Sequence, residues 1–276
     1  GKGASSTVWR CVDRRSGVAY AAKVIDLRPL KFRERFNVER LRREVNIMRK
    51  LHHPSIVNME NAFETEDQLI LVLEFAQGVE LFDAILARKR YSEDDARPVF
   101  LQVARALYYL HSMNVLHRDV KPENIMVRDV VSADGLFPEA KLLDFGLSKM
   151  VGEDMGSAAR TFVGTPCYLA PEVEMRSRGQ GGSYGAAVDC WSLGAVLYVM
   201  LAARFPEFTV LGGGRQSVRM AGPVWDGISD AAKALIRGLM AHDPTQRMTA
   251  DQALRSVWAT QGAPVPLPTV PLSLWG

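Results

Sequence analysis

The sequence predicts an α+β fold in which a small β-rich lobe precedes a larger, mostly helical lobe. Up to residue 76 the chain carries short β-prone apolar runs and one amphipathic helical pattern. Gln77-Gly78 then interrupts this pattern, and apolar residues afterwards recur mainly at helical spacing. We therefore expect an N-terminal lobe over 1–76, a C-terminal lobe over 77–262 and a proline-rich tail over 263–276.

The length and composition of the chain are sufficient for one large domain or two packed lobes with a buried apolar core. The chain has 276 residues with 47% apolar content, and its net charge of +3 is too small to indicate nucleic-acid binding. Cys11, Cys167 and Cys190 form no paired framework, which predicts a reducing compartment, the cytoplasm or nucleus. The apolar run 190–203 is shorter than the roughly 20 residues of a membrane span, so we expect a buried helix and no membrane contact.

The chain opens with a glycine-rich stretch before β-prone residues 8–12. Glycines allow a backbone to approach phosphates, because they lack a Cβ, and loop amides can bind phosphate oxygens. A glycine-rich hairpin turn would have the same composition. Because the chain starts inside this pattern without Met, we expect a fragment that lacks the start of its first strand. The stretch consists of Gly1, Lys2, Gly3, Ala4, Ser5 and Ser6.

Lys23 interrupts the apolar strand predicted over 18–25, and a buried lysine needs a partner. The following helix has apolar residues at helical spacing and carries Glu44, the candidate partner. Farther along, we expect helices over 81–90 and after the capping residue Ser92. We also expect two strands, over 125–127 and 140–143, joined by a turn over 128–139, and no helix at Gly212-Gly213-Gly214.

The most informative stretch is HRDVKPEN at 117–124, followed by DFG at 144–146. Asp119 can accept a hydroxyl proton, and Lys121 can neutralise a moving phosphate. Asn124 and Asp144 can hold hard cations through oxygen. These are the functions that phosphoryl transfer requires.

The two motifs resemble the catalytic and metal-binding loops of eukaryotic protein kinases. The chain as a whole, including RSRGQGGSYG before Asp189, is similar to the calmodulin-dependent-kinase group, and within it to the checkpoint-kinase type. The resemblance implies a bilobal kinase fold with an antiparallel sheet and one main helix in the small lobe. It also implies ATP and Mg²⁺ as cofactors, with Asp119 and Lys121 catalytic and Asn124 and Asp144 as metal ligands.

The resemblance further assigns a nucleotide site. Ser6 replaces the third glycine of the family's glycine-rich loop, and Lys23 with Glu44 matches the pair that holds the α and β phosphates. Leu73 corresponds to the gatekeeper of the pocket. The remaining implied contacts with the adenine come from the backbone of Glu74 and Ala76 and the side chains of Val8, Ala21 and Met126.

The segment GTPCYLAPE at 164–172 resembles the one with which protein kinases seat a peptide, so protein substrates are implied. Lys121 and Thr165 match kinases that act on Ser or Thr. Arg118 and Thr161 match positions through which phosphorylation orders the segment, so we expect an upstream activating kinase. Glu80 and Glu123 match carboxylates that face a substrate arginine in kinases with basic specificity.

Two structural roles also follow from the resemblance. Asp189 is expected to anchor the backbone of the catalytic loop, and Glu172 to pair with Arg247 in the buried interior. Two alternatives to a protein kinase remain. A catalytically inactive scaffold would usually have lost Lys23, Asp119 or Asn124, and all three are present. A small-molecule kinase would lack the 164–172 segment.

Overall fold

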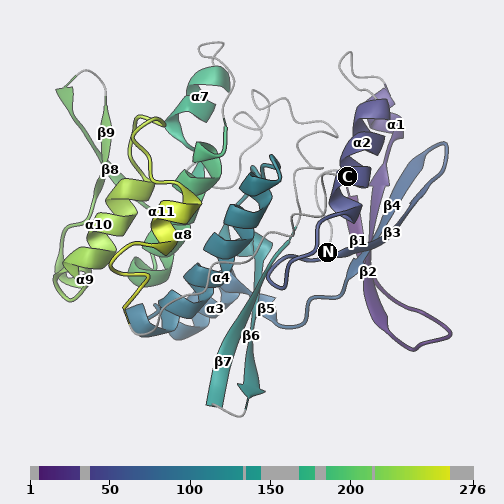
Figure 1. Ribbon diagram of the computed structural model, residues 1–276, viewed down its shortest axis with the longest axis horizontal. Helices are drawn as coiled ribbons and strands as arrows, with labels where there is room; N and C mark the ends of the chain where they lie inside the picture. The colour runs from purple at the N-terminus through teal and green to yellow at the C-terminus, as the bar shows by residue number, and fades with distance from the viewer. Residues whose placement is uncertain are drawn as a thin grey trace.

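The computed structural model describes residues 6–31, 38–132, 135–143, 168–177, 185–212 and 215–261. In Figure 1, a sheet with helix α2 (Val38–Arg49) forms one end of the molecule, and most of the helices form the other. The sheet is antiparallel with strand order β1-β2-β4-β3. Its strands are β1 (Ser6–Val12), β2 (Ala19–Asp26), β3 (Met59–Glu64) and β4 (Gln68–Glu74), and the short helix α1 (Arg28–Lys31) follows β2.

One face of this sheet is buried because alternate residues of its central strands point inward. Ile25, Leu69 and Leu71 are each at most 3% exposed. They belong to the same core as the apolar face of α2, which comprises Leu41, Val45 and Met48. The helical spacing of the α2 residues was visible in the sequence, whereas the strands were predicted from continuous apolar, β-prone runs.

The larger part of the chain is mostly helical, and its core is built around α8 (Ala187–Ala202). Ser92 caps α4 by accepting a hydrogen bond from Asp95 N at 3.1 Å. The other helices are α3 (Leu81–Arg88), α4 (Glu93–Ser112), the 3₁₀ turn η1 (Pro122–Asn124), α7 (Pro171–Ser177), α9 (Pro223–Asp226), α10 (Asp230–Leu239) and α11 (Ala250–Leu254).

Helix α8 contains the apolar run that could resemble a membrane span. Its residues from Val188 to Ala202 are buried apart from the half-buried Ser192. Within the described part of the chain, no helix is long and apolar enough to cross a membrane. The predicted buried helix is therefore confirmed.

The predicted turn over 128–139 is wrong. Instead, β6 (Ile125–Ser132) and β7 (Gly135–Leu142) pair antiparallel along their whole length, and β6 also pairs with β5 (Val79–Glu80). Cross-strand apolar pairs such as Val130 with Phe137 favour this extension. The hairpin projects from the molecule at the bottom of Figure 1.

The glycine-containing stretch after α8 is a second hairpin, of β8 (Glu207–Val210) and β9 (Gln216–Arg219). The prediction that no helix forms at 212–214 stays a prediction, because 213–214 lie outside the described residues and Gly212 itself has 3₁₀ geometry. The four-stranded sheet of the N-terminal lobe is joined to the rest of the molecule by the loop between α2 and β3. Val57 N donates to Leu142 O at 3.0 Å, and Leu142 N donates to Ser55 O at 2.9 Å.

Candidate active site

The loop that carries the HRDVKPEN motif lies between α4 and β6, and Asp189 of α8 holds its backbone. The Asp189 carboxylate is 1% exposed. It accepts hydrogen bonds from His117 N at 2.9 Å, Arg118 N at 2.7 Å and His111 Nε2 at 2.9 Å. Burial raises the pKa of Asp189, but the hydrogen bond from His111 and the charge of that histidine bring it below the usual value. The predicted anchor is confirmed.

This anchor matters because Arg118 has a left-handed backbone conformation, with φ of +65°. That conformation is costly for a residue with a Cβ, about 1–3 kcal/mol, and persists only where surrounding contacts impose it. The two backbone amides bonded to Asp189 are those of Arg118 itself and of the residue before it. The result is a turn that directs the next residue, Asp119, away from the core.

His117 fixes the same loop from the other side. It is fully buried, its Nε2 donates to Leu143 O at 2.7 Å, and its Nδ1 accepts from Asp119 N at 3.2 Å. These partners require the neutral Nε2-protonated tautomer. His117 therefore ties the backbone of Asp119 to the end of β7.

Asp119, Lys121 and Asn124 form one polar cluster. Lys121 Nζ lies 3.0 Å from Asp119 Oδ2, and Asn124 Nδ2 donates to Asp119 Oδ2 at 2.7 Å and to Asp119 O at 2.8 Å. The side chains of Asp119 and Lys121 are 22% and 29% exposed, so a substrate can reach them. Because the amide nitrogen of Asn124 is used by Asp119, its oxygen is directed elsewhere and suits a hard cation.

The sheet presents several predicted nucleotide contacts on one face. In the register of β1, β2 and β4, Val8 lies opposite Lys23 and Ala21 lies opposite Leu73. Because cross-strand partners and residues two apart share a face, all four side chains lie on the same side of the sheet, where Lys23 and Leu73 are buried and Val8 is 37% exposed. Lys23 is 5% exposed, and Glu44 lies half-buried on α2. The pairing of Lys23 with Glu44 stays a prediction.

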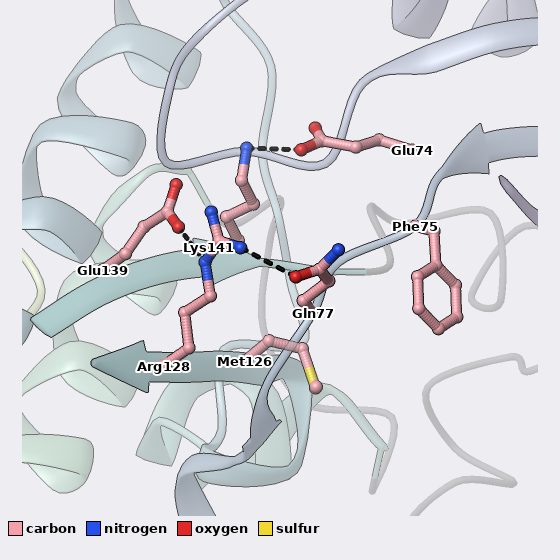
Figure 2. A pocket seen from close by; sticks show the side chains of 7 residues that line it. All are labelled: Glu74, Phe75, Gln77, Met126, Arg128, Glu139 and Lys141. Carbon is pink, nitrogen blue, oxygen red and sulfur yellow. Dashed lines mark hydrogen bonds and ion pairs between the residues drawn. The ribbon is translucent and has the colours of Figure 1, made fainter. Parts of the chain in front are cut away.

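The segment after β4 borders a pocket of about 190 Å³ (Figure 2). Lys141 Nζ lies 2.6 Å from Glu74 Oε1 and also donates to Pro54 O at 3.0 Å. The Glu74 side chain is thus occupied, which agrees with a role for its backbone alone in contacting adenine. Met126 lines the same pocket, and Ala76 packs against the core.

Glu80 and Glu123 form an acidic pair near Lys121. Burial, followed by the charges of Asp83 and Glu123, raises the pKa of Glu80, while Lys121 opposes the rise. Glu123 Oε2 is buried and accepts no hydrogen bond from the described residues. Carboxylates in this state favour a cationic partner.

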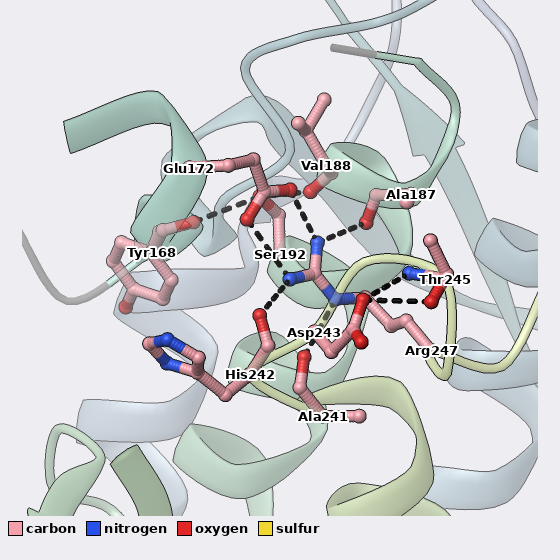
Figure 3. Close-up of polar contacts among 10 residues, drawn as sticks. All are labelled: Tyr168, Glu172, Ala187, Val188, Ser192, Ala241, His242, Asp243, Thr245 and Arg247. Atoms are coloured by element: carbon pink, nitrogen blue, oxygen red, sulfur yellow. Dashed lines mark hydrogen bonds and ion pairs between the residues drawn. The ribbon is translucent and has the colours of Figure 1, made fainter. Parts of the chain in front are cut away.

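The predicted ion pair of Glu172 with Arg247 is confirmed (Figure 3). It is bidentate, with Nη1 to Oε1 at 2.6 Å and Nη2 to Oε2 at 2.9 Å. The Arg247 side chain is fully buried, and it also donates to the carbonyl oxygens of Ala187, Ala241 and His242. The pair fixes the start of α7 against α8 and the loop before α11.

Several predicted site residues lie outside the described residues. They are Gly1, Lys2, Gly3, Ala4, Ser5, Asp144, Thr161 and Thr165. Ser6 is the first residue of β1. Two residues with clear positions near the site were not anticipated: His111, which binds Asp189, and Lys141, which binds Glu74. Each partner is far away in the sequence, so no local pattern could have identified these contacts.

Comparisons with known proteins agree with this geometry. The chain matches the model of the protein kinase domain over residues 1–259. Probable serine/threonine-protein kinase fhkD of Dictyostelium discoideum is 38% identical, over 94% of this chain and 36% of its own length. Calcium/calmodulin-dependent protein kinase type II of Caenorhabditis elegans is 37% identical, over 94% of this chain and 35% of its own length.

A solved structure is also similar. The crystal structure of Rad53 1-466 in complex with AMP-PNP has a TM-score of 0.70 and 30% identity, covering 94% of this chain and 63% of that one. The chain spans about a third of the length of the two kinases above. The match to the family model covers nearly all of the sequence, and the chain therefore belongs to the protein kinase domain family, with relatives that are serine/threonine kinases.

Proposed function

We propose that this chain is a kinase catalytic domain that transfers the γ-phosphate of MgATP to Ser or Thr hydroxyl groups of proteins. The observation that carries the proposal is the cluster in which Lys121 and Asn124 each lie within 3.0 Å of Asp119, on an anchored loop. Phosphoryl transfer depends mainly on positioning and charge, and this cluster supplies both.

Asp119 is the group that orients the acceptor hydroxyl. Its Oδ2 is held by Lys121 and Asn124, and the carboxylate remains partly exposed. As the hydroxyl oxygen bonds to the γ-phosphorus and the bond to the β-phosphate oxygen breaks, the hydroxyl proton passes to Asp119. Lys121, beside it, stabilises the negative charge of the transferred group.

The nucleotide is positioned mainly by the sheet. Lys23 is a buried cation on the face that also carries Val8, Ala21 and Leu73, and it would bind the α and β phosphates. Asn124 together with Asp144 would hold magnesium through oxygen. The metal, when bound, neutralises phosphate charge.

A preference for basic residues before the acceptor is part of the proposal. Its support is the raised pKa of Glu80 and the buried, unbonded Oε2 of Glu123 among the described residues. An arginine placed between the two carboxylates would satisfy both. We further propose that phosphorylation of Thr161 by an upstream kinase activates the domain through Arg118.

The decisive experiment measures transfer of labelled γ-phosphate from MgATP to a peptide with arginine three residues before a serine. We expect transfer by the parent chain and a loss of at least about 100-fold in Asp119→Asn. A matched peptide with glutamate in place of the arginine should react more slowly. ATP binding without transfer in the parent would instead favour an inactive scaffold. Equal rates for the two peptides would contradict the proposed preference for basic residues and leave the proposed kinase activity in place.

A further inference from the structure

The hairpin β8–β9 is anchored at its base and projects beyond α8 and α10 at one side of the molecule (Figure 1). Phe208 stacks on Trp191 of α8, with ring centroids 5.6 Å apart and an interplanar angle of 14°. Val218, its cross-strand partner, is 6% exposed. Tyr198 of α8 also donates its hydroxyl proton to Arg219 O at 3.0 Å. The hairpin is therefore held in a defined position.

The register shows which backbone groups of the hairpin point outward. Leu211 N donates to Arg215 O at 2.7 Å, and Val210 lies opposite Gln216. Leu211 and Arg215 are therefore a hydrogen-bonded pair. Because hydrogen-bonded and non-bonded pairs alternate along an antiparallel ladder, Val210 with Gln216 and Phe208 with Val218 are non-bonded pairs. The amide and carbonyl groups of Val210 and Phe208 consequently point away from β9.

The two edges of the hairpin differ. On the β9 side, Gln216 N donates to His242 Nδ1 at 3.3 Å, so this edge faces the body of the molecule. On the β8 side, no described residue makes a hydrogen bond with the backbone of Phe208 or Val210. The Val210 side chain is 69% exposed. Strand β8 thus presents a short open edge, the kind of surface to which an extended peptide can add as a further strand.

The chain just before this edge contacts the segment that is predicted to seat the substrate. The ring of Phe205, two residues before β8, contacts Tyr168 edge-on with centroids 5.9 Å apart. Tyr168 belongs to the 164–172 segment. The hairpin region carries three arginines, Arg204, Arg215 and Arg219, and one acid, Glu207. Arg219 pairs with Glu207 at 3.7 Å, so the positive excess of the region comes from Arg204 and Arg215, and it favours an acidic strand.

We propose that β8 is a docking edge for an extended, apolar and acidic segment of the protein substrate, outside the phosphorylated motif. The proposal rests on the proposed kinase function. The segment would add a strand beside β8, with its backbone bonded to Phe208 and Val210 and an apolar side chain beside Val210. Because only two residues offer outward groups, the gain in affinity should be modest, about tenfold.

The test compares two peptides. The short one carries arginine three residues before a serine, and the long one adds a Gly/Ser linker and the strand Asp-Val-Thr-Val-Thr-Asp. We expect a KM about tenfold lower for the long peptide with the parent chain. In Val210→Pro this advantage should disappear, because proline removes only the outward N–H and leaves the bonds to β9 intact. Val210→Thr, which keeps the N–H, should retain it.

The short peptide reports whether each variant is folded and active, and its kinetic constants should be unchanged in both variants. Should Val210→Pro fold poorly, Val210→Lys gives a second variant, because an edge charge also opposes strand addition. Equal KM values for the two peptides with the parent overturn the proposal, as does the same advantage in parent and Val210→Pro. Dimerisation of the parent that Val210→Pro abolishes also overturns it, since the edge would then bind a second copy. If even the short peptide is not phosphorylated, the proposed kinase function itself fails.

Discussion

Single residues hold the catalytic loop in a conformation that the chain would not otherwise adopt. Arg118 has a φ of +65°, and its own amide and that of His117 donate to the carboxylate of Asp189. Asp189 is in turn bonded to His111. The strained turn therefore depends on a carboxylate that comes from helix α8 and is itself buried.

Replacing Asp189 by Asn tests this dependence. Asparagine offers one acceptor oxygen in place of two, so one of the two loop amides loses its partner and Asp119 shifts. We expect kcat to fall about 10- to 100-fold, as small displacements of catalytic groups commonly do, with little change in the KM for ATP. Steady-state kinetics measure both constants. An unaltered kcat in a folded variant would contradict the anchoring role.

His53 provides a second test, through the pH dependence of stability. It is 8% exposed, its Nδ1 accepts from Ser55 N at 3.1 Å, and burial, with nearby Arg105 and Lys141, lowers its pKa from 6.5 to about 4. Between these pH values the unfolded state binds a proton that the folded state does not. The free energy of unfolding should therefore decrease as the pH falls from 6.5 to 4, by up to about 3 kcal/mol from this residue.

His53→Gln removes the titrating group and should flatten this part of the profile. Urea unfolding at several pH values between 4 and 7 measures the change. His52→Gln is the matched control, because His52 is exposed at the neighbouring position. Identical profiles for the parent and His53→Gln would show that His53 does not cause the loss.

At the scale of elements, helices were easier to predict than hairpins. The capping residue Ser92 and the apolar spacing located α4, and the long apolar run located α8. The extent of β6 and β7 was missed because Arg128 and Asp129 look like turn residues, although each is paired across the hairpin. Hairpin β8–β9 was missed because its stability comes from Trp191 and Tyr198 of α8, which are distant in the sequence.

Helix α7 provides a prediction at this scale. Its Glu172 is paired with the fully buried guanidinium of Arg247, and breaking a buried pair by removing one partner commonly costs about 3–5 kcal/mol. We expect Glu172→Gln to lower the free energy of unfolding by about that amount. Arg255→Met is the control, because it removes the exposed pair with Asp251 and should cost less than about 1 kcal/mol. Urea titration measures both, and equal losses would contradict the argument.

For the molecule as a whole, contacts within one short motif could be predicted from the sequence, and contacts between distant segments could not. Asp119, Lys121 and Asn124 are within six residues of one another, so their cluster could be inferred from the sequence. The contacts that join the sheet to the rest of the molecule come from separate segments, 53–58, 74 and 141–142. Nothing in the local composition of these segments indicates that they meet.

The pair of Glu74 with Lys141 is the side-chain contact by which this junction can be tested. It is 2.6 Å long, the side chains are 28% and 16% exposed, and Glu74 also accepts from Asn58 N at 3.3 Å. The contribution of such a partly buried pair to stability lies between those of exposed and fully buried pairs. Lys141→Met should therefore lower the free energy of unfolding by about 1–3 kcal/mol. We expect hydrogen exchange of the amides at 74–77 to accelerate by a similar free energy, because the segment loses its link to β7.

The matched control is Arg88→Met, which removes the more exposed pair with Asp129 on the same hairpin. Exchange at 74–77 should then remain as in the parent. Acceleration throughout the protein in Lys141→Met would mean global destabilisation, and no acceleration would mean that backbone hydrogen bonds alone hold the junction. Selective acceleration at 74–77 is expected because Lys141 binds both Glu74 and Pro54 O, and so holds the end of β4 and the loop before β3 to the same strand, β7.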